Sequence, residues 1–175
     1  TEEFTQLRAS RSYGHFLPSV HLRYELDPDT ILRASYSTGI NRPDFMHTAP
    51  YRIIGENPWD NITVGNPDVD AAYAHNLDVS FERYLRPLGL VSAAAFYKRI
   101  EDPLFIANSY ESWEVVDPDD GTVDIVNQRI TRPENGDKGS IYGLELTWQQ
   151  NFDKLPGALS GLGVYANYTW AKSKA

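Results

Sequence analysis

Apolar and polar residues alternate along three pairs of segments in this chain. In the first pair, the apolar residues from Val20 to Leu26 alternate with polar ones, and the pattern resumes at Leu32 after a turn at 27–30. An alternation with a period of two gives a β-strand one apolar and one polar face. The pattern predicts six strands, at 16–26, 31–37, 73–85, 90–100, 139–152 and 162–173.

The connections between these strands alternate between short and long. Strands within a pair are joined by short turns such as 86–89, whereas 38–72 and 101–138 separate the pairs. Loops of that length are rare inside a compact soluble domain, but they are typical of the extracellular end of an outer-membrane barrel, whose periplasmic end has short turns. We therefore expect an all-β fold, with about six antiparallel strands in three hairpins forming an up-and-down segment of a transmembrane β-barrel.

The position of aromatic residues agrees with that expectation. Tyr142 and Trp148 share the apolar face of the fifth predicted strand, and six residues of strand place them about 20 Å apart. Aromatic girdles of membrane barrels occupy such positions, although aromatic residues also favour strands in general. Arg83 falls on the apolar face as well, and because it lies near a turn we expect its side chain to reach the interface.

Composition narrows the choice further. The 175 residues are 41% hydrophobic and contain no cysteine, so a disulfide framework and a thiolate metal site are excluded. A net charge of −8 argues against nucleic acid as a partner. Residues 101–138 contain ten acidic and three basic residues, so one predicted loop carries most of the net charge.

The acidic segment contains a candidate Ca²⁺ site, because carboxylates close together in sequence supply the oxygen ligands that this ion prefers. Gly121 lies one position too early for an EF-hand, and no Glu follows at the required spacing, which favours a solvated turn instead. Glu111 and Glu114 would complete the site if the loop folds back. The four candidate ligands are Asp117, Asp119, Asp120 and Asp124.

Two further groups of residues are candidates for binding. Four aromatic residues in the predicted outside loops offer faces for a sugar ring or another flat ligand, with local packing as the alternative: Tyr51, Trp59, Tyr110 and Trp113. Six polar residues on the predicted strands would face the barrel interior: Arg33, Asn76, Asp78, Glu145, Thr147 and Asn167. The four histidines show no metal-ligand spacing and no Ser-His-Asp arrangement is apparent, so we expect no catalysis.

Several stretches together resemble the β-barrel region of TonB-dependent outer-membrane receptors. They occur in the same order and spacing as in that family, over nearly all of 16–173. After Gly65-Asn-Pro-Asp68 the family often continues with Leu, a charged residue, Pro and Glu, whereas this chain has Val69-Asp-Ala-Ala72. The matching stretches are LPS at 17–19, ILRASYSTGINRPDF at 31–45, GNPDV at 65–69, NLDVSFE at 76–82, AAFYKRIEDPLF at 94–105, GSIYGLEL at 139–146 and GLGVYANYTW at 161–170.

The resemblance implies a location and partners. The chain would be about six strands of a barrel of about 22, in the bacterial outer membrane, without the plug domain. Its partners would be outer-membrane lipid, the plug of the same parent chain, the inner-membrane TonB complex and a small-molecule solute. The six polar residues would then contact the plug rather than the solute.

The sequence does not decide between two classes of substrate, and it leaves one alternative fold. Acidic loops attract an anionic ferric siderophore poorly, whereas exposed aromatic residues suit a neutral oligosaccharide, which we favour. The rival is a secreted carbohydrate-binding β-sandwich, which is also acidic and rich in aromatic residues. It predicts a buried core between two sheets, formed by Leu144, Leu146, Trp148, Tyr168 and Trp170.

Overall fold

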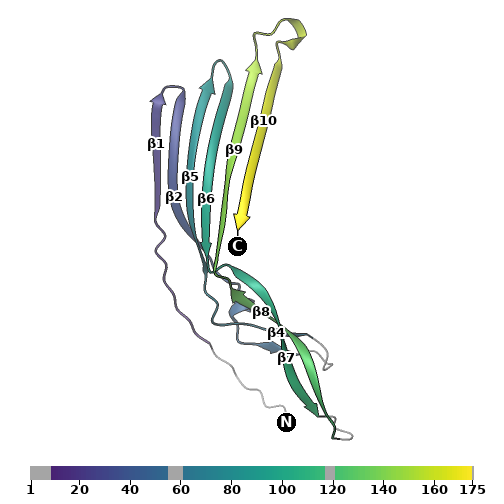
Figure 1. Ribbon diagram of the computed structural model, residues 1–175. Coiled ribbons are helices and arrows are strands. Elements are labelled where there is room, and N and C mark those ends of the chain that lie inside the picture. Colours follow the sequence, from purple (N-terminus) through teal and green to yellow (C-terminus); the bar gives the residue numbers. More distant parts are fainter. Residues whose placement is uncertain (1–8, 55–60, 117–120, 175) are drawn as a thin grey trace. The chain divides into compact units, whose positions relative to one another are not determined.

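The computed structural model describes residues 9–54, 61–116 and 121–174, and within them the fold is all-β (Figure 1). Apart from strands, the described residues form the four-residue helix α1 (Phe45–Thr48) and the 3-10 turn η1 (Gly157–Leu159). No helix in this part of the chain has the length and apolar character needed to cross a membrane.

The chain divides into two compact units, which are described separately. The first, called here the sheet unit, comprises Phe16–Ile40, Tyr73–Glu101 and Lys138–Ala175. The second, called the insert unit, comprises Thr1–His15, Asn41–Ala72 and Asp102–Asp137. That residues 1–175 belong to one partial-barrel domain stays a prediction.

The sheet unit is a single sheet of six strands in the order β1-β2-β5-β6-β9-β10. Each strand overlaps one of the six predicted ranges, and the pairs β1–β2, β5–β6, β6–β9 and β9–β10 are antiparallel. The strands are β1 (Ser19–Asp27), β2 (Thr30–Asn41), β5 (Ala72–Leu85), β6 (Gly89–Glu101), β9 (Lys138–Phe152) and β10 (Leu162–Lys174).

The turn between β1 and β2 is held by side chains from its own residues, from β5 and from the turn that follows β5. Asp27 accepts hydrogen bonds from the Asp29 backbone N–H at 2.9 Å and from Thr30 Oγ1 at 3.0 Å. Arg83 Nη1 donates to the same carboxylate at 2.8 Å, and Arg86 binds Asp29 at 3.2 Å. Arg83, which disturbs the apolar pattern of β5, therefore pairs with an acid at the turn.

A glycine allows three neighbouring strands to pack closely. A Cβ atom at Gly143 in β9 would overlap the Trp170 carbonyl oxygen and would lie 2.7 Å from Phe96 Cζ. Phe96 lies directly opposite Gly143 in the register of β6 and β9, so its ring occupies the space that the glycine leaves. Side-chain cover of a glycine by an aromatic residue on the next strand is a known device of β-sheets.

The insert unit corrects the prediction that 38–72 and 101–138 are loops. It contains a four-stranded sheet in the order β3-β4-β8-β7, in which β4 and β8 are parallel and the other neighbours are antiparallel. A small core forms around Ile62, Val69, Val126 and Ile130, each at most 3% exposed. The strands are β3 (Arg52–Ile53), β4 (Ile62–Val64), β7 (Leu104–Val116) and β8 (Val123–Asn135).

The two ends of the β7–β8 hairpin lie close together in space. Asn135 Nδ2 donates to the carbonyl oxygens of Asp70 and Asp102, at 3.0 and 2.9 Å, and the Asp70 N–H donates to Asn135 Oδ1 at 2.7 Å. In the sheet unit, Glu101 lies opposite Lys138, so β6 and β9 pair fully across this excursion. The hairpin is therefore an insertion between two adjacent strands.

Candidate functional site

Hydrogen bonds between β2 and β5 join polar side chains on one face of the six-stranded sheet. Arg33 Nε donates to Glu82 Oε1 at 2.9 Å, and Ser35 Oγ donates to Asp78 Oδ2 at 3.4 Å. These residues alternate along their strands with apolar ones, so the period-two pattern places the polar groups together. We call this side of the sheet the polar face.

The register extends the polar face across the remaining strands. Ala94 in β6 lies between Ser80 of β5 and Glu145 of β9, and Thr147 lies opposite Asn167 of β10. Residues directly opposite one another in neighbouring strands project to the same side. The structure therefore brings all six predicted polar residues to one face: Arg33, Asn76, Asp78, Glu145, Thr147 and Asn167. That this face lines a barrel interior stays a prediction.

A groove of about 530 Å³ runs over the polar face between Asn76, Asp78, Lys98 and Glu145. Asn76 Nδ2 donates to Ser37 at 3.4 Å, but the amide oxygen of Asn76 has no hydrogen-bond partner within the described residues. That oxygen has almost no exposed surface, so it is not available to a second surface. The groove thus offers carboxylates and an ammonium group to whatever packs on it.

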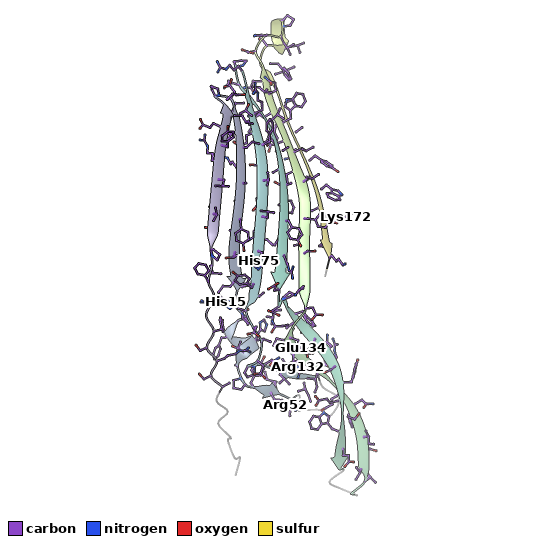
Figure 2. All side chains as sticks on the ribbon, turned by 60° about the vertical axis from the view of Figure 1, so that its left-hand side comes forward. His15, Arg52, His75, Arg132, Glu134 and Lys172 are labelled. Atoms are coloured by element: carbon purple, nitrogen blue, oxygen red, sulfur yellow. The ribbon has the colours of Figure 1, made fainter. Side chains whose placement is uncertain are left out.

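The opposite side of the sheet is apolar along the middle of its strands, with charged residues toward the strand ends, and we call it the apolar face. Leu144 and Leu146 are each 49% exposed, and Trp148 and Tyr168 are exposed as well. Figure 2 shows side chains projecting from both sides of the six strands. Large continuous apolar surfaces on proteins mark contact with a membrane or another protein.

The exposure of this face overturns the β-sandwich alternative. A sandwich requires Leu144, Leu146, Trp148, Tyr168 and Trp170 to be buried between two sheets, whereas their exposed fractions range from 37 to 59%. The same five residues lie on one side of β9 and β10, where Tyr168 is opposite Leu146 and Trp170 is opposite Leu144. The sheet therefore presents to its surroundings the residues that a sandwich would enclose.

The structure separates the aromatic candidates of the insert unit. Trp113 lies opposite the buried Val126, and the guanidinium carbon of Arg52 lies 4.5 Å from the centre of its ring, so a cation covers one face of the indole (Arg52 is labelled in Figure 2). Tyr51 lies close to Gly65, where an added Cβ would be 2.9 Å from the tyrosine ring. Trp59 lies outside the described residues.

Among the aromatic candidates that the structure describes, Tyr110 is the most exposed residue, at 72%. It lies opposite Arg129 on the side of the β7–β8 hairpin away from Trp113. Asn108 Oδ1 accepts hydrogen bonds from Arg129 Nε at 3.1 Å and from Thr131 Oγ1 at 2.9 Å on this same side. Sequence reasoning found Tyr110 but missed these polar neighbours, because their proximity depends on the hairpin register.

A cavity of about 590 Å³ in the insert unit was also missed from sequence. Arg11, Tyr13, Arg42 and Phe45 contribute to its lining, and its volume lies within the range of small-molecule sites. Arg11 pairs with Asp70 at 2.7 Å, whereas Arg42 forms no ion pair with any residue that the structure describes. The cavity therefore offers one unneutralised guanidinium group beside two aromatic rings.

The candidate Ca²⁺ site falls mostly outside the described residues. Asp117, Asp119 and Asp120 are not described, and Asp124 is an exposed residue at the start of β8. Within the described residues, no three histidines or carboxylates lie close enough together to hold a metal ion. The Ca²⁺ site stays a prediction.

Comparison with known proteins gives the family. The family model for the TonB-dependent receptor-like β-barrel matches residues 2–175, and a search of curated proteins found no match. Three similar solved structures are the siderophore receptor PirA from Acinetobacter baumannii (18% identity, TM-score 0.60), PirA from Pseudomonas aeruginosa (16%, 0.63) and a variant of the ferric enterobactin receptor PfeA from Pseudomonas aeruginosa (19%, 0.66).

These likenesses cover 78, 90 and 89% of this chain, respectively, but only 21, 28 and 21% of the receptor chains. At such identities they show the fold, while the family model covers nearly every residue. The family consists of transporters rather than enzymes, which agrees with the lack of any catalytic arrangement in the sequence. The chain belongs to the TonB-dependent receptor family and forms part of its β-barrel region in the bacterial outer membrane.

Proposed function

We propose that this chain forms a section of the barrel wall of a receptor that takes up a scarce small solute, driven by the inner-membrane TonB complex. The observation that carries the proposal is the two-sided sheet. Leu144 and Leu146 are half exposed on the apolar face, while Glu145 and Thr147 between them belong to the polar face. A sheet with this alternation is suited to separate lipid from an aqueous interior.

The lengths of the connections indicate which end of the barrel section would face each compartment. The connections β1–β2, β5–β6 and β9–β10 would lie in the periplasm, and both long segments of the insert unit, 41–72 and 102–137, join strands at the other, extracellular end. Arg83 and Arg86, paired with Asp27 and Asp29, would lie at the periplasmic interface, where paired charges avoid the hydrocarbon core. The groove near Asn76 and Asp78 would receive the plug domain of the parent chain.

For the solute, we favour an oligosaccharide that binds the exposed side of the β7–β8 hairpin. Tyr110 offers a flat ring, and Arg129 and Asn108 retain N–H donors beyond those used in their mutual hydrogen bond. An aromatic face flanked by a few directional polar groups suits a sugar ring, whose faces are apolar and whose edges carry hydroxyl groups.

A ferric siderophore is the alternative solute. The cavity that Arg42 lines favours it, since a guanidinium group without an ion-pair partner among the described residues attracts an anionic chelate. The structural neighbours named above are siderophore and ferric enterobactin receptors, with which this chain shares the fold.

Calorimetric titration of the full parent receptor in detergent tests the choice. Linear and branched oligosaccharides and a ferric catecholate chelate are titrated against the wild type, Tyr110→Ala, Arg42→Gln and the control Tyr168→Ala, which removes an exposed tyrosine from the apolar face. We expect Tyr110→Ala to weaken sugar binding by about tenfold, or about 1.4 kcal/mol, and the other two variants to leave it within twofold. Tight chelate binding that Arg42→Gln abolishes, with no sugar binding, would favour the siderophore.

Uptake itself is tested in cells. Cells that express the parent receptor should accumulate the radiolabelled ligand, and dissipation of the proton gradient should stop accumulation without preventing surface binding. Accumulation that persists without the gradient would contradict energy-coupled transport.

A further inference from the structure

The cavity of the insert unit presents two opposite charges that no described residue neutralises. Arg42 and Asp68 both contribute to its lining. Within the described part of the chain, neither side chain forms an ion pair, either with the other or with a third residue. Their charged groups are therefore more than about 4 Å apart, since closer groups would count as an ion pair. The cavity thus offers a cation and an anion to a ligand that carries both signs of charge.

The hydrogen bonds of Asp68 use its backbone and leave its carboxylate available. The Asp68 N–H donates to Asn66 Oδ1 at 3.0 Å, and its carbonyl oxygen accepts a hydrogen bond from Arg11. The Asn66 N–H donates in turn to the His47 carbonyl oxygen at 2.7 Å, which joins this turn to α1. Asparagine side chains stabilise turns by bonding the backbone two residues further on. The backbone that carries Asp68 is therefore held in place, while its carboxylate can bind a ligand.

Arg11 is also a cation of the cavity lining, but its charge is already neutralised. Its guanidinium pairs with the Asp70 carboxylate at 2.7 Å and also donates to the Asp68 carbonyl oxygen. These contacts attach the segment around Arg11 and Tyr13 to the turn at 66–69. Arg42 is thereby the guanidinium of the lining that is available to a ligand, and a guanidinium can bind a carboxylate through two parallel hydrogen bonds.

The acidic residue nearest to Arg42 in the sequence does not neutralise it. Asp44 lies two residues away, directly before α1, and makes no side-chain hydrogen bond to the start of that helix. It does not line the cavity and forms no ion pair with any described residue. Asp44 is therefore an exposed carboxylate close to Arg42 in sequence but outside the cavity, which makes it a matched control for Asp68.

Apolar rings form much of the remaining cavity wall. Tyr13 and Phe45 are 42 and 80% exposed, so this chain leaves their rings largely uncovered. Pro43, Pro50 and Pro67 line the cavity as well, and proline offers no backbone N–H to a ligand. Aromatic and proline rings suit apolar groups of a ligand. A ligand with charged ends and apolar side groups therefore matches this cavity better than a polyanion, which Asp68 would repel.

The size of the cavity limits the length of such a ligand. Its volume of about 590 Å³ lies within the range of small-molecule sites and corresponds to a compact space roughly 8 Å across. Because an extended chain advances by about 3.3–3.6 Å per residue, two or three residues span about 7–11 Å. A free peptide of this length carries an ammonium group at one end and a carboxylate at the other, so its charges are separated, as are those of Arg42 and Asp68.

We propose that this cavity binds a free peptide of two or three residues with apolar side chains. The peptide carboxylate lies against Arg42, its ammonium group against Asp68, and its side chains against the rings of Tyr13 and Phe45. The proposal goes beyond the oligosaccharide site, because the residues that line the cavity fall within 9–13, 42–50 and 67–69 and none of them belongs to the β7–β8 hairpin. It also assigns to the cavity a ligand class other than a ferric siderophore.

Calorimetric titration of the full parent receptor in detergent with four dipeptides tests the proposal. The probes are alanyl-phenylalanine, its N-acetyl form, its C-terminal amide and the doubly blocked form, so that each charge is removed separately. We expect each single block to weaken binding to the wild type by about tenfold. Arg42→Gln should weaken the free dipeptide by about tenfold but leave the amide within twofold. Asp68→Asn should likewise weaken the free dipeptide but leave the N-acetyl form within twofold.

The control Asp44→Asn should leave binding of the free dipeptide within twofold. The proposal is overturned if no free dipeptide binds, if the doubly blocked dipeptide binds as tightly as the free one, or if Arg42→Gln weakens the amide as much as the free dipeptide. A ferric catecholate that displaces the dipeptide and loses its own binding in Arg42→Gln would also overturn it. Should a variant fail to fold, the four dipeptides titrated against the wild type decide the matter.

Failure of this inference is distinguishable from failure of the proposed function. Dipeptide binding that survives Tyr110→Ala, in a receptor that binds no oligosaccharide, would support the peptide site and reject the favoured solute. Oligosaccharide binding that Tyr110→Ala weakens, in a receptor that binds no free dipeptide, would reject the peptide site and leave the proposed function intact.

Discussion

Replacing Leu146 with arginine tests directly whether the apolar face meets the hydrocarbon of a bilayer. Leu146 lies two residues from Trp148 and four from Tyr142, which is about 7 and 13 Å along the strand. In an apolar band about 25 Å tall, this position is close to the midplane, where arginine on the lipid side of a barrel costs about 2–4 kcal/mol. The folding equilibrium should therefore fall by a factor of about 30 to 700.

The assay is urea-dependent folding of the full parent receptor into vesicles of short-chain phosphatidylcholine, followed by the shift of unheated protein on a gel. Two controls carry the same substitution. Gln150→Arg lies on the same side but beyond Trp148, and Thr147→Arg lies on the polar face opposite Asn167. We expect both controls to cost about 1 kcal/mol or less. If Leu146→Arg costs no more than Thr147→Arg, the apolar face does not meet lipid and the reasoning fails.

Two further predictions concern contacts within the sheet. Gly143→Ala should lower the urea midpoint by the equivalent of about 1–3 kcal/mol, because its Cβ would overlap the Trp170 carbonyl oxygen and Phe96. The control Gly139→Ala should cost little stability, because no atom lies nearer than 3.6 Å to the Cβ that it adds. Equal losses of stability in the two variants would contradict the packing around Gly143. Arg33→Gln should lower the urea midpoint only slightly, since the Arg33–Glu82 pair is partly exposed, and the loss should shrink further in high salt. A loss as large as that of Gly143→Ala would show that the pair is far less solvated than its exposure indicates.

The alternation predicts the strands of the sheet unit because one face of the sheet is apolar and the other is polar. A strand between lipid and a polar interior keeps a strict period of two, and this pattern is visible without any knowledge of partners. The same period groups Arg33, Asn76 and Glu145 on one side before their pairing is known.

The hairpin of the insert unit was missed for the opposite reason. β7 begins with four consecutive apolar residues, Leu104–Ala107, and later carries acids, while β8 contains Pro133. Proline and a broken alternation both argue against a strand. The hairpin nevertheless forms because Val126 and Ile130 join a core with Ile62, which lies far away in the sequence.

The sequence likewise predicts only part of the candidate binding site. Tyr110 is recognisable as an exposed aromatic residue, but its proximity to Arg129 requires the register of β7 and β8. Trp113 is also aromatic and lies only three positions further along the same strand, and yet Arg52 covers its ring. Such proximity depends on the strand order β3-β4-β8-β7, which no local pattern encodes.

The most direct test of the central claim is site-directed spin labelling along β9 of the full parent receptor in vesicles. Single cysteines at Leu144, Glu145, Leu146 and Thr147 carry the label, and the chain's lack of native cysteine within these 175 residues makes the sites unambiguous in this region. We expect labels at 144 and 146 to be accessible to oxygen, and labels at 145 and 147 to be accessible to a polar nickel chelate or shielded by the plug. Equal accessibility to oxygen at all four positions, or shielding of 144 and 146 from both reagents, would contradict a sheet that separates lipid from a polar interior.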